Sequence, residues 1–186
     1  MTEPSRWSRS TSSRGMWVDE PEDPRGGDTV TVGERDTILG YLRHYRLTLE
    51  MKCADLDAEQ LARRSVPPST MSLLGLIRHM ADVERYWFRI VLAGQPVTRR
   101  YRTEADRDAD FNGAVADPSV VAEAWRAWRE EVAFAEEFVA DNLDLGATYA
   151  GDAPLRDLLI HMIEEYARHC GHADLIRERI DGRVGQ

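Results

Sequence analysis

Apolar residues recur along most of the chain at intervals of three and four, which is the spacing of an amphipathic helix. From Glu34 onward this spacing predicts a first helix, whose apolar positions are Ile38, Leu39, Leu42, Tyr45, Leu49 and Leu56. A pair of prolines then interrupts the pattern, and Ser69 or Thr70 offers an N-cap for a second helix. We expect this second helix to be long and largely buried, and to end at Gly94.

The second half of the chain contains two further helical patterns. Asp117 and Pro118 form a strong start signal for a third helix, because aspartate caps well and proline suits the first turn. A fourth helix is predicted over about 154–180, with Gly182 ending it. No segment alternates with the period of two that a strand requires, so we predict an all-α, antiparallel four-helix bundle. The long connection 94–117 is expected either to cross over the bundle or to hold a short helix.

The N-terminal region has a different composition. Residues 1–33 are rich in Ser, Arg, Pro, Gly and Asp and have no helical or strand period, so they predict a disordered tail. A single helical domain is then expected over residues 34–183. In an alternative interpretation, Trp7 and Trp17 dock on that domain. Met16, where basic sequence changes to acidic, is an alternative start of the protein.

Composition narrows the class of protein. The chain has 186 residues, of which 42% are apolar, as expected for one domain with a real core. There is no apolar run of roughly 18 residues and no secretory signal, so we expect a cytoplasmic protein without a membrane partner. The net charge of −9 argues against a nucleic-acid partner and leaves small molecules and proteins. Cys53 and Cys170 are far apart in the sequence and are interpreted as free thiols.

A cluster of candidate metal ligands lies near the C-terminus, in the run EEYARHCGHADLIRE. Glu165 and His172 lie within about 60° of His169 around the helix, beside the core-type residues Met162 and Ile176. Two imidazoles and a carboxylate on an inward stripe are costly to bury without a partner. A divalent cation is the simplest partner, and these ligand types suit zinc, nickel or iron(II).

The remaining histidines and Cys170 differ in their expected position relative to this site. His79 shares an apolar stripe with Leu76, Val83 and Tyr86, so it is expected to face the interior and meet the fourth helix. Alone it would be interpreted as a core histidine, but with several convergent candidates a metal is favoured. His44 is expected to be solvated, and His161, at the edge of the stripe, to lie outside the ligand set. Cys170 points about 100° away from His169 and is interpreted as a packed thiol.

Two segments carry a resemblance to a known family: VPPSTMSLLGLIRHMADVERYWFR and EEYARHCGHADLIRERIDG. They resemble the DinB-like superfamily, which includes mycothiol-dependent maleylpyruvate isomerases and bacillithiol or mycothiol S-transferases. The resemblance implies an up-up-down-down bundle, a divalent metal held by three side chains, and a homodimer. It places one ligand at His79 and matches a Glu-x3-His pair to Glu165 and His169. His172 is the alternative ligand, paired with His169.

Three protein ligands leave open positions on the ion, as in catalytic sites. A bound thiol is deprotonated there and can attack an electrophilic carbon. The resemblance therefore implies an enzyme that activates mycothiol for S-transfer or isomerisation, with a small-molecule thiol and an electrophile as its substrates. A non-enzymatic, stress-related metal-binding dimer and a thiol-independent metal hydrolase remain as alternatives. The apolar stripe of Trp125, Trp128 and Val132 is expected to pack into its own bundle or against a second copy.

Overall fold

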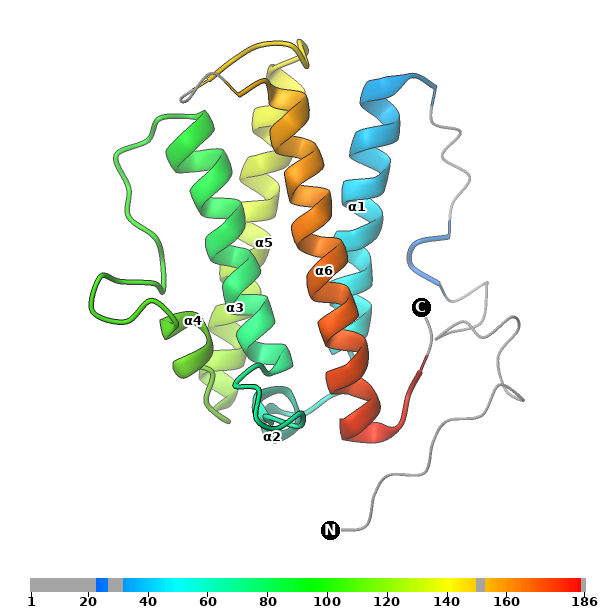
Figure 1. Cartoon of the computed structure of the whole chain (residues 1–186), viewed down its shortest axis with the longest axis vertical. Coiled ribbons are helices and arrows are strands. Elements are labelled where there is room, and N and C mark those ends of the chain that lie inside the picture. The colour runs from blue at the N-terminus through cyan, green and yellow to red at the C-terminus, as the bar shows by residue number, and fades with distance from the viewer. Residues whose placement is uncertain (1–22, 27–31, 150–152, 185–186) are drawn as a thin grey trace.

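Four long helical segments lie side by side in the computed structural model, which describes residues 23–26, 32–149 and 153–184 (Figure 1). They are α1 (Glu34–Cys53), α3 (Leu73–Glu84) continued by the π-helix η4 (Arg85–Leu92), α5 (Pro118–Asp141) and α6 (Leu155–Asp181). Two short helices, α2 (Ala58–Ala62) and α4 (Ala109–Asn112), lie in the connections. The prediction of an all-α bundle is confirmed, and the connection between the second and third long segments does contain a short helix.

The helix directions differ from the order that the resemblance implied. Arg156 at the start of α6 pairs with Glu34 at the start of α1 (Nε to Oε1, 3.0 Å). At the other end, Arg177 of α6 donates to the carbonyl oxygen of Lys52 in α1 (3.0 Å). Helices α1 and α6 are therefore parallel, and α3 and α5 both run in the opposite direction (Figure 1). The chain order is up-down-down-up rather than up-up-down-down, because residues 93–117 run back along the bundle before α5 begins.

Local signals explain most of the helix ends. The side chain of Asp117 accepts a hydrogen bond from the backbone N–H of Ser119 (2.7 Å), and Pro118 occupies the first turn of α5. Gly182 ends α6 with φ 82°, a left-handed conformation that glycine adopts without strain. The predicted cap of the second helix is wrong by two or three positions. Ser72, rather than Ser69 or Thr70, accepts from the backbone N–H of Gly75 (3.1 Å).

The second long segment is not one regular α-helix as predicted. After Glu84 it widens into the π-helix η4, in which the backbone N–H of Ala93 donates to the carbonyl of Phe88, five residues earlier (2.9 Å). Gly94 follows with φ 61°, so the predicted end at this glycine is confirmed. The wider turn changes which side chains of η4 face the bundle, and π-turns of this kind are frequent near functional sites.

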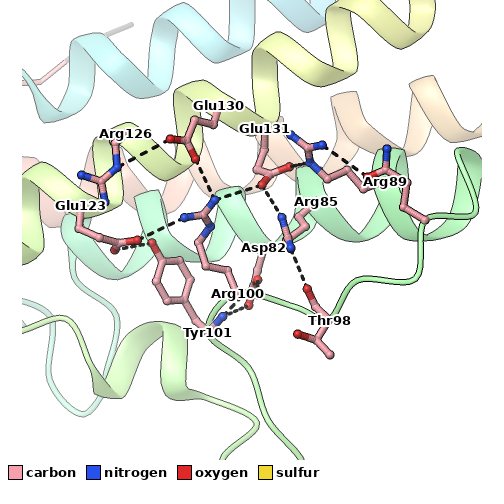
Figure 2. A network of polar contacts seen from close by, with 11 residues as sticks. Asp82, Arg85, Arg89, Thr98, Arg100, Tyr101, Glu123, Arg126, Glu130 and Glu131 are labelled. Atoms are coloured by element: carbon pink, nitrogen blue, oxygen red, sulfur yellow. Dashed lines mark hydrogen bonds and ion pairs between the residues drawn. The ribbon is translucent and has the colours of Figure 1, made fainter.

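The connection that follows η4 is fixed onto α3 by one buried carboxylate (Figure 2). Asp82 accepts hydrogen bonds from the backbone N–H groups of Arg100 (2.6 Å), Tyr101 (3.1 Å) and Arg102 (2.9 Å). The buried Glu131 of α5 forms ion pairs with three nearby arginines, which are Arg85, Arg89 and Arg100. This stretch of the connection is therefore held in a defined conformation against α3 and α5.

The predicted tail lies mostly outside the described residues, because residues 1–22 and 27–31 are not described, and Trp7, Met16 and Trp17 are among them. The described piece 23–26 forms a turn beside α1. There Arg25 donates through Nη1 to Oγ1 of Thr48 (3.4 Å). The tail over 1–33 and the domain boundary at residue 34 stay predictions. Among the described helices, none combines the length and the apolar character that crossing a bilayer demands.

Candidate metal centre

Three of the predicted ligands come together between α3 and α6. One potential ligand atom from each of His79, Glu165 and His169 lies within 4.8 Å of the other two. The three side chains are largely shielded from solvent, with exposed fractions of 16%, 19% and 12%. Glu165 and His169 are four residues apart on α6, so they project from the same side of successive turns. His79 faces them from the middle of α3.

His79 is oriented by a residue that the sequence analysis missed. Its Nδ1 lies 2.8 Å from Oδ2 of Asp110, which is buried in the short helix α4. Asp110 is itself held in place, because its Oδ1 accepts from the backbone N–H of Phe111 (3.0 Å) and its carbonyl accepts from Nε of Arg78 (2.7 Å). With Nδ1–H donated to a carboxylate, Nε2 of His79 is the atom left for a ligand.

Close packing brings this short helix against α3. A Cβ atom at Gly75 would stand 2.6 Å from Cδ1 of Phe111, so only glycine permits this approach. The ring of Phe111 then stacks on His79, with 5.4 Å between the centroids. Gly75 lies one turn before His79, but a single glycine and an aromatic residue in the connection do not indicate this contact from the sequence alone.

His169 has a separate partner on each side of its ring. Its Nε2 lies 3.5 Å from Oε2 of Glu165, and its Nδ1 lies 3.3 Å from Nδ1 of His172. Burial lowers the pKa of His169 to about 3, and the charges that His79 and His172 would carry act in the same direction. The imidazole is therefore neutral at physiological pH, which is the form that binds a metal.

The other sequence candidates occupy less central positions. His172 lies outside the group of three convergent donors, and its contact is with His169. His161 is at the rim, with Nε2 3.5 Å from Oε1 of Glu165 and its ring edge against Trp87. His44 is exposed on α1, as predicted. The structure thus brings together His79, Glu165 and His169, with His161 and His172 on either side of the α6 pair.

The donor set has the composition that a divalent cation requires. Two imidazoles and a carboxylate converge, and with Nδ1–H of His79 donated to Asp110, Nε2 of His79 offers a lone pair. The 3.5 Å contact between Glu165 and His169 is longer than the 2.7–2.9 Å of a short charge-assisted hydrogen bond. A cation between the three groups would satisfy all of them, so the residues present fit a metal ion of the zinc, nickel or iron(II) class.

Comparison with known protein families gives a match over most of the chain. A family model described as mycothiol-S-transferase matches residues 37–182, which is most of the chain. The chain belongs to the mycothiol-S-transferase family. This membership confirms the resemblance to the mycothiol-related branch of the DinB-like superfamily. Searches of curated proteins and of solved structures gave no match.

In this mycothiol-S-transferase family member, the chain's own thiols are not available for chemistry. Cys170 is buried, and its Sγ lies 3.6 Å from the carbonyl oxygen of Tyr45. Burial raises the pKa of Cys170 to about 12 and raises that of the buried Cys53 as well. Both cysteines are free, as predicted, and Cys170 is a packed thiol. Neither cysteine is therefore suited to act as a thiolate nucleophile.

A second buried polar cluster lies next to the candidate centre, and we call it the Glu84 network. Both carboxylate oxygens of Glu84 accept from the guanidinium of Arg46, at 2.8 and 2.9 Å. The hydroxyl of Tyr166 donates to Glu84 (2.7 Å) and accepts from Nε1 of Trp128 (2.8 Å). The network joins α1, α3, α5 and α6. It was not foreseen from the sequence, although Trp128 does pack into its own bundle.

Proposed function

We propose that this protein is a divalent-metal-dependent enzyme that transfers mycothiol to an electrophilic carbon. The observation that carries the proposal is the convergence of His79, Glu165 and His169 in a family member whose own cysteines are buried. Family membership supports mycothiol as the thiol substrate. When bound, a divalent ion with open positions would stabilise a thiolate at neutral pH.

The chain's own residues have separate tasks in this proposal. His79, Glu165 and His169 would hold the ion, and Asp110 fixes the ring of His79 through Nδ1. The ring of Phe111 covers one side of His79 and limits access of water there. The thiol loses its proton to solvent, the sulfur forms a bond to the electrophilic carbon, and the leaving group departs with its bonding electron pair.

Turnover of a model electrophile tests this function. We expect metal-loaded wild-type protein to conjugate mycothiol with monochlorobimane, releasing chloride. His79→Ala should lose this activity, because it removes a ligand, whereas His44→Ala, at an exposed histidine, should retain it. Absence of metal-dependent turnover with bound metal would contradict the proposal and favour a non-enzymatic metal-binding protein. Ester or amide hydrolysis that persists without any thiol would instead favour a metal hydrolase.

We also propose a homodimer in which each chain has a complete site, since all three candidate ligands belong to one chain. Mixing wild-type protein with His79→Ala protein should then give activity in proportion to the wild-type chains present. Activity well below that proportion as mixed dimers form would mean that the site is shared between subunits. Sedimentation measurements on the same mixtures give the oligomeric state directly.

A further inference from the structure

The connection after η4 forms an open cavity of about 570 Å3 that the metal centre does not include. It is lined by Thr98, Arg99, Arg102, Thr103, Glu104 and Arg107. Three of these side chains are cationic and one is anionic, so the lining carries a formal charge of +2, while the whole chain carries −9. A concentration of arginine at a hollow surface of an acidic protein is the arrangement that attracts a small anion.

The three arginines of the cavity wall, Arg99, Arg102 and Arg107, differ from neighbouring arginines in their ion pairing. Arg85, Arg89 and Arg100 all form ion pairs with Glu131. Among the described residues, no such pair engages Arg99, Arg102 or Arg107, although Glu104 lies in the same cavity wall. All three line the cavity, and a guanidinium offers hydrogen-bond donors in the fork geometry that suits carboxylate and phosphate oxygens.

The side chain of Arg99 and the backbone of Arg102 are also held in position before any ligand arrives. The guanidinium of Arg99 stacks over the ring of Tyr86 in η4, with 4.0 Å from its carbon to the ring centroid. The backbone of Arg102 is anchored by its hydrogen bond to Asp82 (2.9 Å). Burial and the nearby charge of Arg102 lower the pKa of Arg99, so an anion in the cavity would relieve an existing repulsion.

The cavity and the candidate metal centre are linked through α3 and the connection that follows η4. Its anchor, Asp82, follows His79 by one turn of α3, and Asp110, which orients His79, belongs to the same connection. The carboxylates of Asp82 and Asp110 both act on the charge of Arg99. An anionic group held by Arg99 would therefore lie on the side of α3 that faces Asp110, the partner of His79.

We infer that Arg99, Arg102 and Arg107 bind the carboxylate or phosphate group of a small anionic electrophile, which is the second substrate. The assignment of this ligand as a substrate rests on the proposed function, whereas the anion site itself does not. The three guanidinium groups fix the anionic end and leave the reactive carbon directed toward the centre. The cavity thus favours anionic electrophiles over neutral ones.

Anion binding is measured first, by calorimetry at low ionic strength on metal-free protein. Succinate and inorganic phosphate are the probes, and the probe that binds more tightly identifies the preferred class of anion. Each single change, Arg102→Gln or the exposed Arg107→Gln, is expected to weaken binding about tenfold, as loss of one charge-assisted contact does. Arg64→Gln, at an exposed arginine elsewhere, serves as the matched control. No binding to wild type, or equal binding to all variants, overturns the inference.

Substrate selection is measured second, with mycothiol and two related electrophiles, neutral chlorodinitrobenzene and anionic 4-chloro-3-nitrobenzoate. The ratio of kcat/KM for the anionic over the neutral electrophile should fall about tenfold in Arg99→Gln/Arg102→Gln, and stay constant in Arg64→Gln. A constant ratio in the double variant overturns the substrate assignment. If neither electrophile reacts while anion binding depends on the arginines, the proposed function fails and the anion site stands.

Discussion

Two buried polar clusters adjoin each other between α3 and α6, and they use their polar atoms differently. In the Glu84 network, both carboxylate oxygens are matched by donors from Arg46 and Tyr166 at 2.7–2.9 Å. In the candidate metal centre, Glu165 and His169 lie on either side of Tyr166 in the sequence of α6. Their closest contact with each other is 3.5 Å. The polar atoms of the first cluster are satisfied by protein groups, whereas those of the second converge at distances longer than a short hydrogen bond.

The difference separates a structural role from a binding role. A buried carboxylate that is fully paired with a guanidinium and a hydroxyl joins helices, and removal of one partner leaves a buried charge. A cluster whose polar groups meet only at long distance gains little from its own contacts and gains much from a cation. We therefore expect changes in the Glu84 network to alter stability, and changes in the metal centre to alter affinity for a metal.

The largest effect is expected for Glu84→Ala. Loss of this carboxylate leaves the buried Arg46 with only its 3.6 Å contact to the exposed Glu136 and should lower the free energy of unfolding by about 3–5 kcal/mol. Thermal unfolding should then show a melting temperature lower by about 10 °C. Glu136→Ala is the matched control, because Glu136 also pairs with Arg46 (3.6 Å) but is 59% exposed, and it should cost less than about 1 kcal/mol. Equal costs for the two variants would contradict a structural role of the network.

Substitution of a candidate metal ligand should reduce metal affinity strongly and change stability little. Glu165→Ala and His169→Ala should each weaken metal binding more than about 100-fold, exceeding the usual cost of losing an outer-shell partner. The stability of the metal-free protein should change little, because these side chains gain little from their own contacts. His172→Ala should weaken binding less, since His172 contacts His169 and not the other two donors. Competition with a chromophoric chelator measures the affinities, and the reverse order would move the centre one turn along α6.

A smaller loss of metal affinity is expected from Asp110→Asn. This change keeps the shape of the side chain but removes the charge that orients His79 through Nδ1, so affinity should fall about tenfold. Asp108→Asn, at an exposed aspartate of the same connection, is the control and should bind as wild type does. Identical affinities for the two variants would show that Asp110 does not position His79.

The last effect concerns the pH dependence of the metal-free protein. The pKa of His169 is about 3 in the folded chain and near 6.5 when exposed, so the unfolded state binds the extra proton between these values. The free energy of unfolding is therefore at its full value above pH 6.5, where the ring is neutral in both states. It decreases as pH falls toward 3, because the unfolded state takes up the proton first. Urea unfolding between pH 7 and 5 should show wild type losing about 1 kcal/mol per pH unit relative to His169→Leu. Parallel profiles would contradict a buried, neutral His169.

The two clusters also differ in how far they could be predicted from the sequence. Helix period and spacing placed Glu165 and His169 on one face and pointed His79 inward, because those are local properties of single helices. The cap at Asp117 and the end at Gly182 were predictable for the same reason. Asp110 and Tyr166 find their partners only through tertiary packing, so no sequence pattern indicated them. The π-turns of η4 and the order of helix directions likewise depend on how the segments pack together.

The central claim is that the donors on α3 and α6 form a metal site, and elemental analysis of protein purified without a histidine tag tests it most directly. We predict about one divalent ion per chain in wild type and in His44→Ala, and less than about one tenth of that in His79→Ala. The same analysis identifies the ion as zinc, nickel or iron. Equal metal content in His79→Ala and wild type, or no binding by wild type even on titration with these ions, would contradict the account.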